Sequence, residues 1–256
     1  MSDANLQDIC PTHLQKTRTL IAALTGESRG MALNLGCGTG KHTQLLSAEG
    51  FKVISTDIDI ENLKTVKKIS ENVVLADASM LPFKQNAFDL LSCIDVLEHV
   101  EKEVDCLAEI KRTVRPQGTV ILSVPVKNYP FAYDPINKIR TLLKLKPLPI
   151  GLYAWGHRRL YGAEIHDLVQ KKFEVQAIWK KSSWLIALLE WYWPYLFVYH
   201  FKKFIPAKTN ENGAPAIVAS LAQFICLLDD LLFCEALGYI NIVFKLKNPK
   251  AQGGVL

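Results

Sequence analysis

The sequence predicts an α/β fold built on a doubly wound, mostly parallel sheet, and three observations support this prediction. Short apolar runs alternate with helical segments between residues 31 and 125. Strands that alternate with helices in this way form βαβ units, whose strands pair in parallel. A glycine-rich turn, NLGCGTGKHT, joins the first strand to the next helix, and the strand–helix pattern resumes after residue 160. Together these features define a Rossmann-like sheet.

Each element follows from its local pattern. A helix-like segment, about Thr12 to Leu24, precedes the first strand. The expected strands are MALNLG, FKVISTDID, VVLAD, FDLLSCID, TVILSVP, FEVQAIWKK and GYINIVFKLK. The expected helices between them are KHTQLLSAEG, ENLKTVKKI, the amphipathic VEKEVDCLAEIKRTV, and YGAEIHDLVQKK. The amphipathic helix is expected to end at Arg115-Pro116-Gln117-Gly118, because proline does not continue a helix.

Two insertions interrupt this pattern. The core is expected over about 31–125, 160–181 and 238–248, and the insertions over 126–159 and 182–237. From residue 127 to 159 there are seven basic residues against Asp134 alone, a net charge of +6. The second insertion opens on WLIALLEWYWPYLFVYHF, residues 184–201, where 15 of 18 residues are apolar and only Glu190 has a formal charge.

Composition excludes several classes of protein. Apolar residues make up 49% and charged residues 21% of the 256 residues, which is normal globular usage. A net charge of +5, without a dense Lys/Arg run, does not indicate a nucleic-acid binder. The six cysteines form no CxxC pair and have no metal-ligand spacing with histidine, so we expect reduced thiols and no metal. The first 20 residues do not form a secretory signal, which favours a cytoplasmic location.

Three loops at the ends of successive strands contain candidate binding residues. Gly36, Gly38 and Gly40 allow a tight turn and let a ligand approach the backbone at the start of a helix. Asp57 ends the second strand, where a carboxylate can accept both hydroxyl hydrogens of a ribose, and Asp77 follows the third strand. Alone, the glycine turn is also compatible with plain strand-to-helix geometry, and Asp57 with a helix N-cap or a turn aspartate. Because ligands bind beyond the carboxyl ends of parallel strands, these loops are expected to meet at one site.

The ordered series LNLGCGTGKHT, VISTDID, LADASMLPF, FDLLSCIDVLEHV and RTVRPQGTVILSVP resembles the class I S-adenosylmethionine-dependent methyltransferases. It is most similar to their small-molecule branch, of the methyltransferase type 11 kind that includes quinone-biosynthesis enzymes. The resemblance covers about 31–125 strongly and 155–181 weakly. It implies one methyltransferase domain over 1–256, with an antiparallel last strand and both insertions on the active-site face.

The resemblance also implies S-adenosylmethionine as cofactor and assigns its contacts. The glycine loop would hold the methionine part, Asp57 the ribose, and Asp77 with the Ala78 backbone the adenine. The full set of implied cofactor residues is Asn34, Gly36, Cys37, Gly38, Gly40, Asp57, Ile58, Asp77, Ala78 and Ile94. One position departs from the family, which usually has Asp or Glu where this chain has Asn34. Asparagine keeps a carbonyl oxygen but loses the negative charge.

Candidate catalytic residues lie in LEHV and WGHRRLY. Methyl transfer is accelerated by holding the acceptor close to the methyl group, and a hydroxyl acceptor also benefits from a base near neutral pKa. His99 and His157 are the candidate bases, with Asp95 and Glu98 as supporting acids. Each histidine is also compatible with a packing or capping role. Arg158 and Arg159 fit either an anionic acceptor group or a solvated loop.

The aromatic stretch 184–201 admits three interpretations. Eighteen helical residues reach about 27 Å, marginally enough to span a bilayer. The return segment 216–237 contains Asp229 and Asp230, which disfavours spanning. Peripheral docking at the inner face of a membrane and a lid over an oily acceptor pocket both remain open.

These features favour an enzyme that methylates a hydrophobic or lipid-linked small molecule, with O-methylation slightly preferred over C-methylation. The alternative is a non-catalytic scaffold or binding module that uses the apolar insertion, and Asn34 speaks for it. An NAD-dependent oxidoreductase is disfavoured, because the loop has GxGxG spacing and not the GxGxxG of dinucleotide sites.

Overall fold

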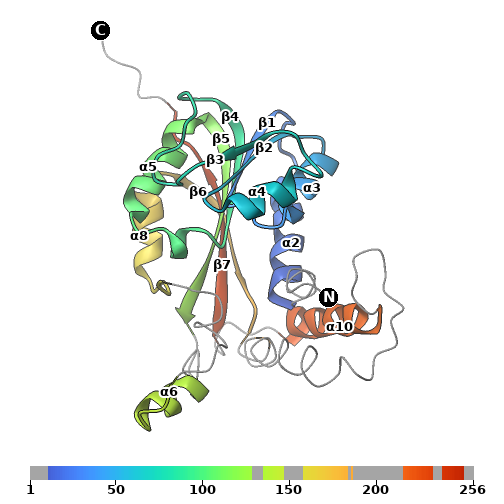
Figure 1. The fold of residues 1–256 in the computed structure, drawn as a ribbon, viewed down its shortest axis with the longest axis vertical. Helices are drawn as coiled ribbons and strands as arrows, with labels where there is room; N and C mark the ends of the chain where they lie inside the picture. The colour runs from blue at the N-terminus through green and yellow to red at the C-terminus, as the bar shows by residue number, and fades with distance from the viewer. Residues whose placement is uncertain are drawn as a thin grey trace. The chain divides into compact units, whose positions relative to one another are not determined.

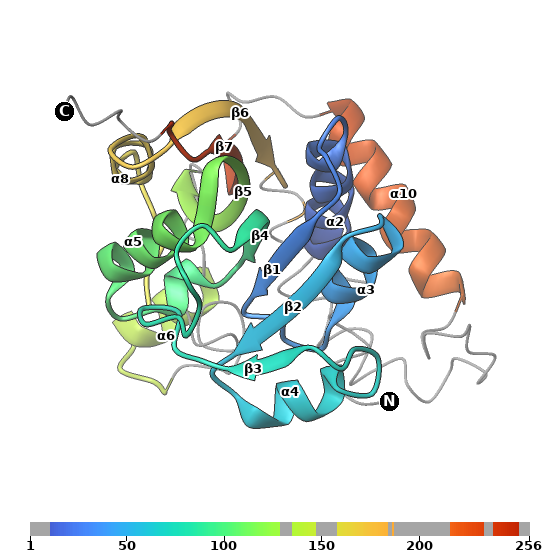
Figure 2. The same ribbon diagram turned by 90° about the horizontal axis from the view of Figure 1, so that it is seen from above.

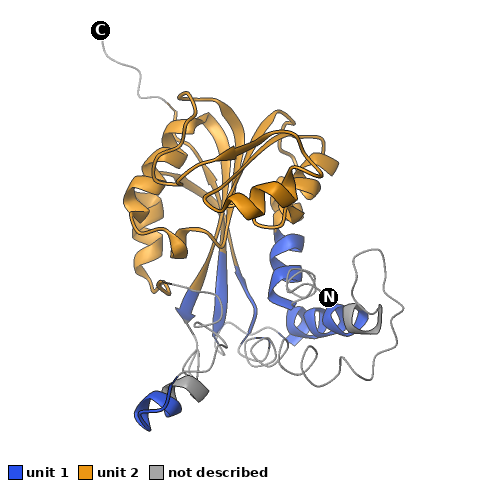
Figure 3. Cartoon of the chain, in the orientation of Figure 1, with its two compact units in different colours: residues 1–19, 126–157, 180–242 blue, residues 20–125, 158–179, 243–256 orange. Residues whose placement is uncertain are grey.

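The computed structural model describes residues 11–128, 135–146, 158–183, 186, 216–232 and 238–250. The chain divides into two compact units (Figure 3). Unit 1 comprises residues 1–19, 126–157 and 180–242, and unit 2 comprises residues 20–125, 158–179 and 243–256. The division lies close to the two predicted insertions, and unit 2 contains most of the predicted core.

The strands form one seven-stranded sheet in the order β3-β2-β1-β4-β5-β7-β6 (Figure 1). They are β1 (Met31–Leu35), β2 (Lys52–Asp57), β3 (Val73–Leu75), β4 (Phe88–Ile94), β5 (Val114–Asn128), β6 (Glu174–Lys181) and β7 (Tyr239–Lys247). The pairs β1–β2, β2–β3, β1–β4 and β4–β5 are parallel. β7 runs in the opposite direction to β5 (Figure 1). The predicted Rossmann-like fold, with its antiparallel last strand, is confirmed.

Helices cover both faces of this sheet, as a doubly wound fold requires (Figure 2). They are α2 (Pro11–Leu24), α3 (Lys41–Ala48), α4 (Ile60–Val66), the 3₁₀ helix η1 (Leu97–His99), α5 (Glu103–Thr113), α6 (Pro135–Leu142), α8 (Glu164–Gln170) and α10 (Ala216–Leu232). α2 and α3 lie on one face, and α5 and α8 on the other (Figure 2). The parallel order brings the carboxyl ends of β1, β2, β3 and β4 to one edge of the sheet.

The central strands form because their sequences suit burial on both faces. Four of the five residues of β1 and six of the seven residues of β4 are buried. Near-continuous apolar runs of this kind are typical of parallel sheets covered by helices on both sides. One core cluster of unit 2 joins helices and strands through Leu20, Leu46, Val53, Leu90, Ile121 and Val243, among others.

One element differs clearly from the sequence-based expectation. Residues 115–118, where the amphipathic helix was expected to end, lie inside β5, which begins at Val114 directly after α5. Phe88 pairs with Val114 and Leu90 pairs with Thr119, so the residues between Val114 and Thr119 are looped out of the ladder. Gln117 has a left-handed φ of 62° in this bulge. The proline and glycine therefore mark a β-bulge and not a separate turn.

Two helices of the predicted insertions are described in unit 1. α6 forms part of the first insertion and α10 part of the second. Among the residues that the structure describes, no helix is both long and apolar enough to span a bilayer. The aromatic stretch 184–201, apart from Ile186, lies outside the described residues, as does His157.

Candidate cofactor site

The loop between β1 and α3 requires glycine at its three predicted positions. Gly36, Gly38 and Gly40 have left-handed φ values of 67°, 50° and 91°. A Cβ atom at Gly36 would clash with Val96, and one at Gly40 would clash with Ile69. A Cβ atom at Gly38 would meet nothing within 4 Å. Side chains therefore pack against the loop at Gly36 and Gly40. The loop is open at Gly38, where a ligand can approach the backbone.

Asp57, the last residue of β2, holds this loop in place. Its Oδ2 accepts a hydrogen bond from the Gly38 N–H at 2.8 Å, and its Oδ1 accepts one from the Asp59 N–H at 2.9 Å. The helix-capping role belongs to Asp59, whose side chain accepts from the Glu61 N–H at the start of α4. Each carboxylate oxygen has two lone pairs, so Asp57 can accept further hydrogen bonds from a ribose diol.

Asn34 points into the protein beneath the loop. It is only 2% exposed, and its Nδ2 donates to Oγ1 of Thr43 in α3 at 3.0 Å. The Thr43 hydroxyl in turn lies 2.8 Å from the Ser55 hydroxyl of β2. This buried network joins β1, α3 and β2 without a formal charge. The predicted contact between Asn34 and the methionine part of the cofactor stays a prediction.

Cys37 contributes its backbone to the loop. Its N–H donates to the Thr56 carbonyl oxygen at 2.8 Å, which extends the β1–β2 pairing into the glycine turn. Burial, together with the negative charge of Asp57, raises the pKa of the Cys37 thiol to about 12. The thiol is therefore protonated at neutral pH and does not act as a nucleophile.

Asp77 lies in an exposed turn after β3. Its Oδ1 accepts hydrogen bonds from both the backbone N–H and the hydroxyl of Ser79, each at 2.8 Å. These hydrogen bonds lower the pKa of the Asp77 carboxyl, so the group is ionised at neutral pH. Ala78, the next residue, is buried beneath the turn. The arrangement leaves an anionic hydrogen-bond acceptor at the edge of the sheet, and its contact with an adenine amino group stays a prediction.

Helix α5 holds in place the segment that follows the Asp77 turn. The sequence did not indicate this contact. The Arg112 guanidinium donates to the carbonyl oxygens of Leu81 and Phe83 at 2.9 and 2.7 Å. Glu109 accepts from Arg112 and from the Leu81 N–H, at 2.7 and 2.8 Å. The hydrogen bond from Arg112 is the main cause that lowers the pKa of Glu109. The only sequence signal was an acid and a base three residues apart on an amphipathic helix, a common surface pattern.

We expect Arg112→Gln to weaken cofactor binding about three- to tenfold, because the segment that follows the Asp77 turn loses the hydrogen bonds from Arg112 to the Leu81 and Phe83 carbonyl oxygens. Calorimetric titration with S-adenosylmethionine measures the dissociation constant directly. Arg29→Gln is the matched control, since Arg29 lies in the loop before β1 and bonds to Glu49. Equal affinities for the two variants would contradict the positioning role of Arg112.

Three large apolar side chains are exposed close to these carboxylates in sequence. Ile58 follows Asp57 and is 73% exposed, and Met80, three residues after Asp77, is 77% exposed. Leu75 ends β3, is also exposed, and pairs in register with Asp57. Exposed apolar groups beside two carboxylates suit a ligand that has a flat aromatic base attached to a sugar.

The end of β4 presents Asp95 in a conformation that is uncommon for residues with a side chain. Its φ is 56°, its N–H donates to the Ser123 carbonyl oxygen, and its Oδ1 accepts from the Ser123 hydroxyl at 3.1 Å. Aspartate tolerates the left-handed region better than most residues, and such positions cluster at functional sites. Ile94, directly before it, is buried in the core cluster.

His99 lies on η1, in the loop between β4 and α5. Its side chain is 38% exposed, and its Nε2 lies 3.9 Å from Oε1 of Glu98, whose side chain is fully buried. The imidazole is therefore partly accessible from solvent and has a buried carboxyl group as its neighbour.

Residues 158–161 hold the loop between β4 and α5 in place. Arg159 forms an ion pair with Glu103 at 2.6 Å and donates to the Val100 carbonyl oxygen at 2.9 Å. The Tyr161 hydroxyl donates to Glu103 at 2.8 Å. Burial, followed by the bond to Glu103, raises the pKa of Tyr161. Arg159 is thus engaged in fixing the β4–α5 loop, whereas Arg158 is exposed.

The residues at this edge fit S-adenosylmethionine. The open backbone at Gly38, the carboxylates of Asp57 and Asp77, and the exposed apolar side chains of Ile58 and Met80 match its amino acid, sugar and base in chemistry. All of them belong to unit 2.

Comparisons with known proteins show which domain the chain resembles. Residues 33–122 match the family model described as a methyltransferase domain. The chain is 26% identical over 138 residues to the demethylmenaquinone methyltransferase of Renibacterium salmoninarum, covering 53% of this chain and 57% of the relative. It is 32% identical over 103 residues to the malonyl-[acyl-carrier protein] O-methyltransferase of Hamiltonella defensa, covering 39% and 40%. The chain thus spans about half or less of the length of these relatives.

Among solved structures, the fold resembles phosphoethanolamine N-methyltransferase 2 of Haemonchus contortus in complex with S-adenosyl-L-methionine. The TM-score is 0.58 at 16% identity, covering 92% of this chain and 53% of the other. Residues 33–122 thus match a methyltransferase domain, and the chain shares the α/β fold of this S-adenosylmethionine-dependent methyltransferase.

Proposed function

We propose that this protein transfers a methyl group from S-adenosylmethionine to a hydrophobic or lipid-linked small molecule, with an oxygen acceptor preferred. The observation that carries the proposal is the Asp57 carboxylate, which holds the open glycine loop and is followed by the exposed Ile58. The cofactor supplies an electrophilic methyl group when bound. Calorimetry with S-adenosylmethionine tests the proposal, and an absence of saturable binding would refute it.

The acceptor class is inferred from the two insertions and from two relatives. The aromatic stretch 184–201 and the +6 first insertion favour an oily acceptor, and one relative is named for demethylmenaquinone. Another relative is named for O-methylation. A screen of lipid extracts with isotopically labelled S-adenosylmethionine would identify the acceptor.

In the proposed reaction, His99 takes the proton from the acceptor hydroxyl. The Glu98 carboxylate, 3.9 Å away, stabilises the imidazolium that forms, and Asp95 lies on the same loop. His157 remains the second candidate base and lies outside the described residues.

We expect His99→Gln to lower the turnover number while leaving the dissociation constant for S-adenosylmethionine unchanged, because glutamine cannot act as a base near neutral pH. Turnover with the acceptor found in the screen, and calorimetry on the same preparation, separate the two quantities. His166→Gln is the control, since His166 lies in α8 and its ring packs against Phe244 of β7. Full turnover in His99→Gln would mean that His99 is not the base. Either His157 is then the base or the reaction needs none.

A non-catalytic S-adenosylmethionine-binding module is the second candidate function. The buried Asn34 favours it, because this position has no charge and its amide is bonded to Thr43. Saturable cofactor binding without methylation of any lipid fraction would support this alternative.

A further inference from the structure

Helix α10 of unit 1 has its apolar face turned outward. Its buried positions are Ala222, Cys226 and Asp229, which repeat at helical spacing. Large apolar side chains, 39% to 79% exposed, occupy the remaining faces: Leu221, Phe224, Leu227, Leu231 and Leu232. A surface helix ordinarily turns its apolar stripe toward the core, so this arrangement is inverted.

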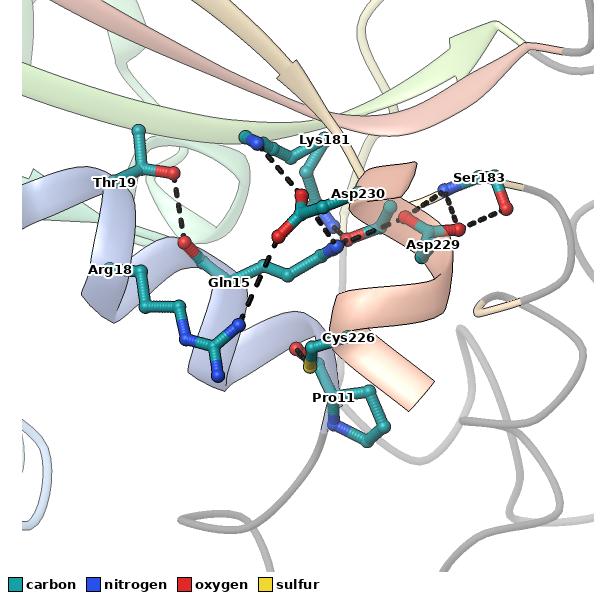
Figure 4. Close-up of polar contacts among 11 residues, drawn as sticks. Pro11, Gln15, Arg18, Thr19, Lys181, Ser183, Cys226, Asp229 and Asp230 are labelled. Atoms are coloured by element: carbon teal, nitrogen blue, oxygen red, sulfur yellow. Dashed lines mark hydrogen bonds and ion pairs between the residues drawn. The ribbon is translucent and has the colours of Figure 1, made fainter. Parts of the chain in front are cut away.

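Polar contacts fix this orientation (Figure 4). Asp229 is 3% exposed and accepts hydrogen bonds from Nε2 of Gln15 at 3.0 Å and from the N–H and hydroxyl of Ser183. Asp230 accepts from Nζ of Lys181 at 2.9 Å and lies 3.9 Å from Nη1 of Arg18. The two carboxylates therefore face α2 and the end of β6, and two cations neutralise Asp230. Rotating the apolar side chains inward would break these bonds.

A second segment of unit 1 combines exposed apolar and basic residues. Ile139, Leu142, Leu143 and Leu145 are 49% to 83% exposed. Lys144 and Lys146 are exposed beside them, and Arg140 donates to the Lys146 carbonyl oxygen at 2.8 Å. No acidic residue occurs between 135 and 146. Basic side chains among exposed leucines suit an interface between acyl chains and anionic headgroups.

We propose that unit 1 docks on the surface of an anionic phospholipid bilayer through the outward face of α10 and through residues 139–146. The charge pattern selects this partner, because protein–protein interface cores are depleted in lysine, whereas bilayer interfaces attract it. The ion pairs of Asp230 support the same partner, since they prevent repulsion between α10 and anionic headgroups. The inference goes beyond the proposed methyl transfer and does not depend on it, because the cofactor residues lie in unit 2.

Co-sedimentation with vesicles tests this docking. The intact chain is mixed with vesicles of phosphatidylglycerol and phosphatidylcholine, or of phosphatidylcholine alone. We expect Leu227→Glu combined with Leu231→Glu to lower the partition coefficient at least about tenfold, because two apolar anchors are lost. Gln223→Asn keeps an exposed position of the same helix polar and uncharged, and is expected to stay within about twofold of the parent.

A charge variant tests the second contact. Lys144→Glu combined with Lys146→Glu should reduce binding to the phosphatidylglycerol vesicles about tenfold and leave the weak binding to phosphatidylcholine unchanged. Circular dichroism melts and S-adenosylmethionine calorimetry on each variant show whether it is folded and whether unit 2 is intact. Parent-like sedimentation of the double leucine variant would overturn the docking. A second result would also overturn it. If the parent is a dimer in light scattering and does not bind vesicles, and the double leucine variant is a monomer, then a second copy of the chain covers α10.

Discussion

Asp57→Ala is expected to raise the dissociation constant for S-adenosylmethionine at least about 100-fold. The carboxylate has two roles that alanine cannot perform. It holds the glycine loop through the N–H groups of Gly38 and Asp59, and it is the proposed acceptor for the ribose hydroxyls. A hydrogen bond to a charged group contributes about 1.5–3 kcal/mol, so losing two of them gives an effect of this size. Calorimetric titration of the purified variant measures it.

Two further variants separate binding from folding. Asp57→Asn keeps the shape and one carbonyl acceptor, so its affinity should fall between those of the parent and Asp57→Ala. Asp59→Ala removes the N-cap of α4 and should cost about 1 kcal/mol of stability with an unchanged dissociation constant. If Asp57→Ala binds the cofactor as tightly as the parent, the ribose assignment is wrong.

Much of this site was predictable because parallel strands end at one edge. Once the strands of residues 31–94 were placed in order, the glycine loop, Asp57 and Asp77 had to meet, whatever the side-chain details. The structure confirms that order. It also shows that the helix-capping role considered for Asp57 belongs to Asp59, which caps α4, whereas the ribose contact stays a prediction.

The orientations of polar side chains were not predictable in the same way. The sequence shows that Asn34 replaces an acid but not that its amide faces Thr43, because a buried strand residue can point to either face of the sheet. The hydrogen bond from Arg112 to the Leu81 carbonyl oxygen joins residues that are 31 positions apart, and no local sequence pattern predicts it. The inverted face of α10 depends on Gln15, which lies 214 residues from Asp229.

Glu27→Gln is expected to lower the free energy of unfolding at pH 7 by on the order of 3 kcal/mol. The Glu27 carboxylate, 13% exposed, lies 2.7 Å from Nζ of Lys245 and 3.0 Å from Nζ of Lys247 in β7, and accepts from the Thr119 hydroxyl of β5. Burial alone raises the pKa of Glu27, but the hydrogen bonds from Lys245, Thr119 and Lys247 outweigh it and lower the pKa from 4.5 to about 2. The cluster therefore stabilises the pairing of β5 with the antiparallel last strand.

The pH dependence follows from the direction of this shift. A carboxyl whose pKa is lower in the folded state contributes its full stability above the unfolded value of 4.5, and this contribution is lost as the pH falls toward 2. Urea denaturation at pH 7, 4.5 and 2.5 should show the stability gap between parent and Glu27→Gln narrowing toward the lowest pH. Glu49→Gln is the control: its ion pair with Arg29 is on the surface and should contribute less than about 1 kcal/mol at pH 7. A gap that stays constant from pH 7 to 2.5 would mean that Glu27 acts by packing and not by its charge.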